Sequence, residues 1–306
     1  MVLVTLVLWR VDLSAALVSL RGLPAWALAL AAVTALSEEL LLGPLKWRRV
    51  ARAVGCPLSL RETWLVRLGS QPLRVVLPLK SGELATALYL ERRHGLPLAR
   101  GVSTVLFEKA VNLWALVLLL LTGAVLLEGP LVLVGWLAWL GVPFVRGPWR
   151  DGASAMARRW GSPGRLGASL LDAYLALSRR ELLVQLPLAV AFVGLEVWNT
   201  GLVLTALGAE PSPALLLLAV PASSFLNNLP VTILGIGVRE GWLLVALGGT
   251  APPETLLAGG LVITAVEYVL PTLVGLSLLP AFLTRLANPR AATAVSDQAM
   301  TTPDAP

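Results

Sequence analysis

Residues 77–95 read LPLKSGELATALYLERRHG, and they follow an apolar run that is itself suited to a bilayer. A proline, a lysine, a Ser-Gly pair and a glutamate interrupt that run within 78–83. The chain has 306 residues, of which 57% are hydrophobic and 14% charged, and its mean hydropathy is +0.79. This composition excludes an ordinary soluble domain and predicts several membrane spans. Polar residues inside an apolar run of such a chain indicate a structural or functional purpose.

Four segments are long and apolar enough to be clear spans: 24–45, 98–127, 182–207 and 254–283. A shorter apolar segment covers 131–145, and the start MVLVTLVLW is too short to cross a core of about 30 Å alone. We therefore expect an all-α polytopic membrane protein with about six spans. Residues 1–285 are predicted to form one membrane domain. The tail 286–306 lacks apolar periodicity and is predicted to be disordered.

Basic residues indicate the orientation of these spans. Lys and Arg cluster at 46–52, 92–93, 146–180 and 285–290, whereas 128–130, 208–213 and 248–254 contain none. The positive-inside rule places the basic connections and the C-terminal tail in the cytoplasm of a cell membrane, with Arg10 and Arg21 in an outside loop as a mild exception. The basic loop 146–180 contains an amphipathic segment that is predicted to lie along the inner leaflet.

Two further apolar stretches, 58–91 and 213–248, each begin and end on one side of the membrane under this assignment. Each is broken near its centre, by LPLKSGEL at 77–84 and by LPVTILGIGVREG at 229–241. Re-entrant helical hairpins that enter from opposite faces fit this pattern best, because irregular backbone is tolerated at membrane depth where protein or water covers it. The two centres are alike, as in the inverted repeats of many transporters. Pro and Gly also recur wherever membrane helices kink, so both readings of this likeness stay open.

Eleven ionisable residues fall within the spans and broken segments. Exposing all of them to lipid would cost roughly 30 kcal/mol, which exceeds the stability of a small membrane protein. They must therefore face a shared interior, pair with one another, or border a water-filled cavity. The eleven are Glu38, Glu39, Glu83, Glu108, Glu196, Glu240, Glu267, Arg74, Lys80, Lys109 and Arg239.

A headgroup-binding site is predicted from the spacing of these charges and of nearby amides. Residues three or four apart share one face of a helix, and amides can satisfy the backbone groups freed at a break. A helix N-terminus beside an arginine attracts anions. The candidate residues are Lys80, Glu83, Glu108, Lys109, Asn112, Glu196, Asn199, Asn227, Asn228, Arg239 and Glu240.

Structural readings of the same charges remain open. Arg239 and Glu240 are equally suited to ion pairs that only lock the bundle, and Glu38 and Glu39 to pairing with Lys80 or Lys109. Glu267 with Tyr268 is compatible with a simple buried hydrogen bond. Arg74 and Arg67 are assigned to the membrane interface. One cysteine and one histidine argue against a disulfide and a metal centre, no cofactor is expected, and the net charge of +6 reports orientation rather than nucleic-acid binding.

Two stretches, LPLKSGELATALYLERRHGLPLARGVSTVLFEKAVNLWAL at 77–116 and NNLPVTILGIGVREGWLLVALG at 227–248, resemble the lysylphosphatidylglycerol synthase transmembrane-region family. The resemblance extends over about 24–283. It implies a flippase-like membrane protein that handles an anionic or aminoacylated phospholipid, or a polyprenyl-linked lipid. Thr86, Lys109 and Asn112 stand where the family commonly has arginine, arginine and aspartate, so the headgroup chemistry is expected to differ.

The expected function is translocation of a polar or charged-headgroup lipid through a polar chamber between the two hairpins. The alternative is a non-transporting accessory subunit or an enzyme of polyprenyl-linked glycan or aminoacyl-lipid synthesis. Catalysis is not expected, because the outside loops offer no paired carboxylates and no aminoacyl-transfer domain follows the last span. A homo-oligomer and a lipid-synthesis enzyme partner are both compatible with the sequence.

Overall fold

Four long helices form the frame of the molecule. The computed structural model describes residues 13–77, 82–145, 178–228 and 237–288, with four further positions between 151 and 159. The first long helix joins α3 (Ala25–Ser37), the π-helical turn η1 (Glu38–Leu42) and α4 (Gly43–Ala53). The next two are α8 (Leu98–Glu128) and α11 (Arg179–Ala206), and the last joins α14 (Pro253–Thr264), η5 (Ala265–Val269, also π-helical) and α15 (Leu270–Ala287).

These four helices confirm the four clear spans predicted from the sequence. In the described part of the chain they are the helices long and apolar enough to cross a membrane. The described residues contain four such helices against the expected six or so, and 131–145 forms only the short helices α9 (Leu133–Gly141) and η4 (Val142–Phe144), which follow η3 (Gly129–Leu131). Leu13–Arg21, expected to belong to a loop, forms the helix α2 and packs on α14. Residues 1–12 and most of the basic loop 146–180 lie outside the described residues.

The two broken stretches each form a pair of arms. The first hairpin consists of α5 (Leu60–Gly69) and α6 (Gln71–Val76), followed by α7 (Gly82–His94). The second consists of α12 (Pro213–Asn228) and α13 (Val238–Ala246). Gly237 begins α13 with a φ of +89°, a conformation that glycine adopts without strain. The centres of both breaks, 78–81 and 229–236, lie outside the described residues.

The two ends of each hairpin meet. In the first, Glu62 on α5 accepts a hydrogen bond from the Tyr89 hydroxyl on α7 at 2.9 Å. In the second, the Glu210 N–H ahead of α12 donates to the Thr250 carbonyl after α13 at 3.3 Å. Each hairpin therefore returns to the side from which it starts, which confirms the prediction.

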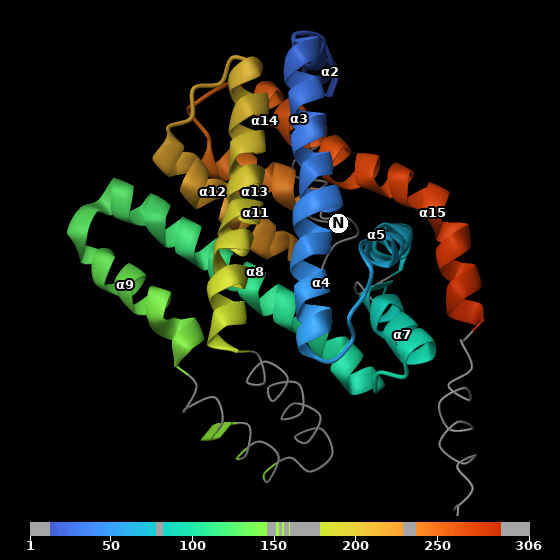
Figure 1. Cartoon of the computed structure of the whole chain (residues 1–306). Coiled ribbons are helices and arrows are strands. Elements are labelled where there is room, and N and C mark those ends of the chain that lie inside the picture. Colours follow the sequence, from blue (N-terminus) through green and yellow to red (C-terminus); the bar gives the residue numbers. More distant parts are fainter. Residues whose placement is uncertain are drawn as a thin grey trace, which may run out of the picture.

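The hairpins open at opposite ends of the frame. An Arg49–Glu181 ion pair of 3.2 Å joins the end of α4, from which the first hairpin departs, to the start of α11. The second hairpin departs instead from the other end of α11. In Figure 1, α7 and α4 end at the bottom of the view, where α11 begins, and the connection from α11 to α12 lies at the top.

The helix contacts of the two halves follow the same pattern, as an inverted repeat would require. The first arm of each hairpin packs on the last long helix of the other half, α5 on α15 and α12 on α8. The second arm of each packs on the long helix that follows it, α7 on α8 and α13 on α14. The first long helices of the two halves, α3–α4 and α11, lie side by side and run in opposite directions (Figure 1).

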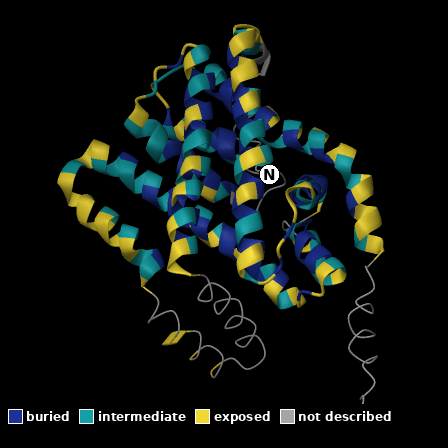
Figure 2. Cartoon of the chain, viewed as in Figure 1, coloured by how far each residue is buried: buried dark blue, intermediate teal, exposed yellow. Residues whose placement is uncertain are grey.

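Side chains are sorted by face on these helices. Figure 2 shows exposed residues on the outward faces and buried ones where the helices meet. Large apolar residues on the outward faces include Trp26, Val33, Leu126, Trp198 and Val245. A solvated protein would expose few such residues, whereas lipid contact stabilises them.

Small residues allow the exchanged arms to approach closely. A Cβ on Gly123 of α8 would lie 2.7 Å from the Ala214 carbonyl oxygen of α12. A Cβ on Gly275 of α15 would collide with the Leu68 carbonyl oxygen of α5. Helix association in lipid depends on such close packing because no hydrophobic effect separates protein from lipid tails.

We predict that Gly123→Ala and Gly275→Ala each destabilise the bundle by about 1–3 kcal/mol, the usual cost of overpacking. Thermal unfolding in detergent, followed by tryptophan fluorescence, measures the effect. Gly135→Ala is the matched control, because nothing lies within 4 Å of a Cβ at that position. Unchanged unfolding midpoints in both tight-contact variants would show that these glycines do not set the approach of the arms.

Candidate functional site

Buried ionic side chains gather in two clusters, one at each hairpin. The centre of the first cluster is Arg67 on α5, which forms a two-pronged ion pair with Glu108 on α8. Nη1 lies 2.7 Å from Oε2 and Nη2 lies 3.0 Å from Oε1. The Arg74 guanidinium on α6 donates to the Arg67 carbonyl at 2.6 Å. Such fork-to-fork geometry is among the strongest ionic contacts in proteins and fixes orientation.

Two polar contacts extend the first cluster along α8. Lys109 lies 2.6 Å from the Glu83 carboxylate, which stands in the first turn of α7. Lys46 on α4 donates to the Asn112 amide oxygen. The side chain of Lys109 is 41% exposed, whereas Lys46 is almost fully buried. The Glu83–Lys109 pair thus forms the outer edge of the first cluster.

Arg239 on α13 is the centre of the second cluster. Its Nη1 lies 2.7 Å from Glu267 on η5, and its Nη2 lies 3.2 Å from Glu196 on α11. The Ser224 hydroxyl on α12 donates to the same Glu196 oxygen. Tyr268 stacks over the guanidinium at 5.1 Å. With Arg239 only 3% exposed, this cluster is sealed, and one guanidinium serves carboxylates from two different helices.

Glu240 holds the second hairpin in shape. Its carboxylate accepts the Gly237 N–H at 2.6 Å and the Thr264 hydroxyl at 2.9 Å. The first contact caps the start of α13, and the second attaches α13 to α14. Gly260 leaves the necessary space, since a Cβ there would lie 3.0 Å from Cγ of Glu240. Both oxygens of the Glu240 carboxylate therefore accept hydrogen bonds that hold α13 in place.

Glu38 and Glu39 lie on η1 between the clusters. Glu38 is within electrostatic range of Glu196, Glu267 and Arg239, whereas Glu39 acts on Arg67 of the first cluster and on Tyr268 of the second. Both π-helical turns of the described chain carry a glutamate of the site, Glu38 on η1 and Glu267 on η5, and π-bulges are frequent at functional sites.

The structure distributes the sequence-predicted site residues between the two clusters. Glu83, Glu108, Lys109 and Asn112 belong to the first, and Glu196, Arg239 and Glu240 to the second. Asn199 is fully buried, and neither of its amide atoms has a hydrogen-bond partner among the described residues. Asn227 is buried near the end of α12, while Lys80 and the side chain of Asn228 lie outside the described residues.

Several residues of the site were missed or misplaced by sequence reasoning. The assignment of Arg67 and Arg74 to the interface is wrong, because both turn inward. The pairing of Lys109 with Glu38 or Glu39 is wrong as well, since Lys109 pairs with Glu83. Lys46 was counted only as an orientation signal. A detectable signal existed for Arg67: it stands two helical turns beyond the Ser59 cap, inside the apolar stretch.

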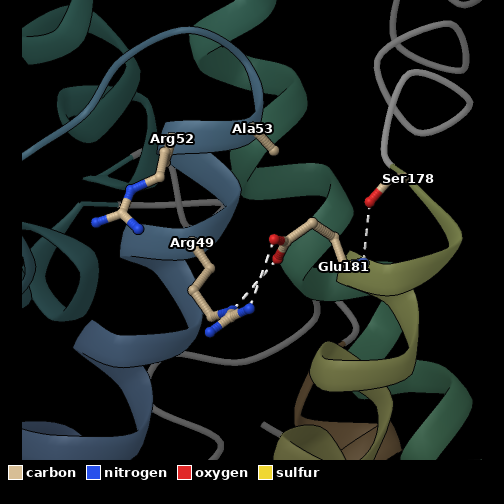
Figure 3. A pocket seen from close by; sticks show the side chains of 5 residues that line it. All are labelled: Arg49, Arg52, Ala53, Ser178 and Glu181. Atoms are coloured by element: carbon tan, nitrogen blue, oxygen red, sulfur yellow. Dashed lines mark hydrogen bonds and ion pairs between the residues drawn. The ribbon is translucent and has the colours of Figure 1, made fainter.

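A separate surface pocket lies at the ends of α4 and α11. Its lining residues are Arg49, Arg52, Ala53, Ser178 and Glu181 (Figure 3). Arg49 and Glu181 are paired across it, and Ser178 caps α11 by accepting the Glu181 N–H at 3.1 Å. None of these residues contributes to the clusters described above. We read this pocket as a contact between helix ends.

Four apolar long helices with buried ionic clusters at two inverted hairpins define a polytopic helical membrane protein. The chain belongs to a family described as the lysylphosphatidylglycerol synthase TM region, whose sequence model matches residues 1–275. The suspected family is thereby confirmed. A comparison with curated proteins found no match.

We predict that Arg67→Met destabilises the protein by about 3–5 kcal/mol, because it leaves Glu108 as an uncompensated buried charge. The double variant Arg67→Met/Glu108→Leu should recover most of this loss, since removing both partners removes the penalty. Thermal unfolding in detergent measures both. Glu83→Gln provides the comparison at the hydrated edge and should cost about 0–1 kcal/mol. A double variant as unstable as the single one would contradict the assigned ion pair.

Proposed function

We propose that this protein translocates a lipid with a polar or charged headgroup, which passes between the two hairpins while its acyl chains stay in the bilayer. Membership of the family supports a lipid-related function in a membrane. The observation that carries the proposal is the pair of ionic clusters, one on each of two hairpins that open at opposite ends of the frame.

The clusters offer both kinds of contact that a phospholipid headgroup needs. A guanidinium fork such as that of Arg239 matches the geometry of a phosphate, and a carboxylate such as Glu83 attracts an amine. A headgroup that replaces one partner of an ion pair keeps the remaining charge compensated. Exchange of partners therefore avoids most of the cost of moving charges through hydrocarbon.

The edge of the first cluster supports access from the lipid phase. The Lys109 side chain is 41% exposed, and it lies on one face of α8 with the exposed residues Leu106 and Leu113. Leu84 is exposed beside Glu83. A partly exposed ion pair can meet a headgroup without rearrangement, whereas Arg239 must first be uncovered. A hydrated pair surrounded by lipid-facing leucines is instead placed where a headgroup can reach it.

An orientation follows from the end at which the first hairpin opens. There Arg92 and Arg93 donate to the carbonyls of Leu286 and Asn288 at the end of α15, and Arg49 lies at the same end. We propose that this end faces the cytoplasm of a cell membrane, because cytoplasmic connections are rich in Lys and Arg.

Translocation is expected to fall at least tenfold in Arg239→Lys, which keeps the charge but loses the fork, and in Glu83→Gln. The measurement uses purified protein in vesicles that contain acyl-labelled phosphatidylglycerol or phosphatidylethanolamine, with labelled lipid in the outer leaflet read by chemical quenching. Glu181→Gln is the control, since it removes a half-exposed carboxylate outside both clusters.

Size-exclusion profiles must show that all three variants remain monodisperse. Wild-type rates in both cluster variants would contradict the proposed route. A purified wild-type chain that moves no labelled lipid, but copurifies in a stable complex with a lipid-synthesis enzyme, would instead identify an accessory subunit.

A further inference from the structure

Glu38 is a buried carboxylate without an ion-pair partner among the described residues. It is 6% exposed, and its Oε1 is buried with no hydrogen bond in that part of the chain. Oε1 of Glu267 is buried in the same situation. Two carboxylate oxygens with unused acceptor capacity thus lie in this part of the bundle.

The surroundings of Glu38 contain more acid than base. Among the described residues, the acidic groups that act on it are Glu196 on α11, Glu267 on η5 and Glu39 on its own turn, and the basic group is Arg239 on α13. On α5, Arg67 is committed to Glu108, and on α4, Lys46 is bound to Asn112. Tyr268 adds a hydroxyl 3.5 Å from the Arg239 guanidinium. Three carboxylates, those of Glu38, Glu196 and Glu267, therefore share one guanidinium.

An ionised carboxylate is costly in a low-dielectric interior unless a cation or hydrogen-bond donors compensate it. The guanidinium of Arg239 is already bound to two carboxylates. Within the described residues, no group of acids, histidines or cysteines is arranged to hold a metal ion. The described residues place no further cation beside Glu38, and a bound proton would convert the acid into a neutral hydrogen-bond donor.

We propose that Glu38 is a proton-binding site that couples lipid movement to a transmembrane proton gradient. This inference rests on the proposed function and adds its energy source. In the arrangement described, Glu38 carries a proton, and Arg239 remains bound to Glu196 and Glu267.

Release of that proton changes the competition for Arg239. The carboxylic acid of Glu38 becomes a carboxylate, and the proton passes to water on one side of the membrane. The new negative charge repels Glu196 and Glu267 and attracts the guanidinium. Because Arg239 belongs to α13 and Glu267 to η5, a shift of the guanidinium toward η1 loosens the second hairpin from α14–α15. Uptake of a proton from the other side restores the first arrangement.

The first test reads the proton directly and needs no lipid movement. Infrared spectroscopy of the purified protein at neutral pH should show the carbonyl band of a protonated carboxylic acid, with its characteristic shift in deuterated buffer. Glu38→Gln should remove this band without unfolding the protein, because glutamine has the shape of the neutral acid. Glu181→Gln and Glu38→Asp should retain a band. A band unchanged in Glu38→Gln, or no band in the wild type, overturns the assignment.

The second test reads coupling in vesicles with acyl-labelled phosphatidylglycerol. A pH difference of one unit is imposed while valinomycin and equal potassium clamp the membrane potential. One proton per lipid supports up to about a tenfold steady-state asymmetry of label between leaflets, because one pH unit and a tenfold ratio are the same free energy. Glu38→Gln should give equal distribution, and Glu181→Gln should match the wild type.

The outcomes separate this inference from the proposed function. Wild-type lipid movement that ignores the pH difference overturns the coupling and leaves translocation standing. Absence of lipid movement at any pH overturns the proposed function together with its coupling, while the infrared band still decides whether Glu38 binds a proton.

Discussion

The cost of an ionised side chain in hydrocarbon is the constraint on which this structure depends. Arg67 with Glu108, and Arg239 with Glu196 and Glu267, satisfy it by binding across helices that are distant in the sequence. Each such contact fixes one arm of a hairpin against a long helix. Breaking one partner of a buried pair is far more costly than losing both, so the pairs enforce the register of the bundle as well as its stability.

The same constraint explains the hairpins. A chain that interrupts a helix at membrane depth must cover the freed backbone with protein. Here each first arm lies on the last long helix of the opposite half, and glycines at the contact permit this approach. In one corresponding ion pair, the acid and the base exchange places between the two hairpins. An acid near the start of α7 meets a base on α8, Glu83 with Lys109, whereas Arg239 near the start of α13 meets the acid Glu267 on η5. One pair is partly exposed and the other buried, which makes the two halves chemically unequal.

The sequence predicted the parts of the fold that follow from the length of the apolar segments and from whether a stretch crosses the membrane an even number of times. Uninterrupted apolar segments identified the four long helices, and matching loop charges at both ends of the broken stretches required an even number of crossings. The helix 13–21 was not predicted, because it is short and carries an arginine at its end. The ion-pair partners within the site could not be predicted for another reason. Glu108 binds Arg67, 41 residues away, rather than its neighbour Lys109, and only the tertiary fold, which brings the Arg67 side chain to α8, decides between them.

Inward-facing charges near a membrane boundary are hard to distinguish from interfacial ones. Arg67 and Lys46 are of the residue types that extend from a helix end to the membrane interface. Whether such a side chain points to the interface or into the bundle depends on which face of its helix packs against neighbouring elements. Trp47, next to Lys46, is also fully buried, which shows that this part of α4 lies within the bundle rather than at its rim. A single sequence contains no such information about direction.

The central claim, that two hairpins enter from opposite faces and that each holds an ionic cluster, is tested most directly by cysteine accessibility. Burial, with a smaller contribution from Glu62, raises the pKa of the native Cys56 thiol to about 11, so it reacts poorly, and Cys56→Ser gives a silent background. Single cysteines are placed at Glu210 and Thr250 for the second hairpin, and at Arg61 and Arg92 for the first. An impermeant maleimide should label 210 and 250 from one side of oriented vesicles and 61 and 92 from the other. Labelling of 210 and 250 from opposite sides would contradict the second hairpin and the route built on it.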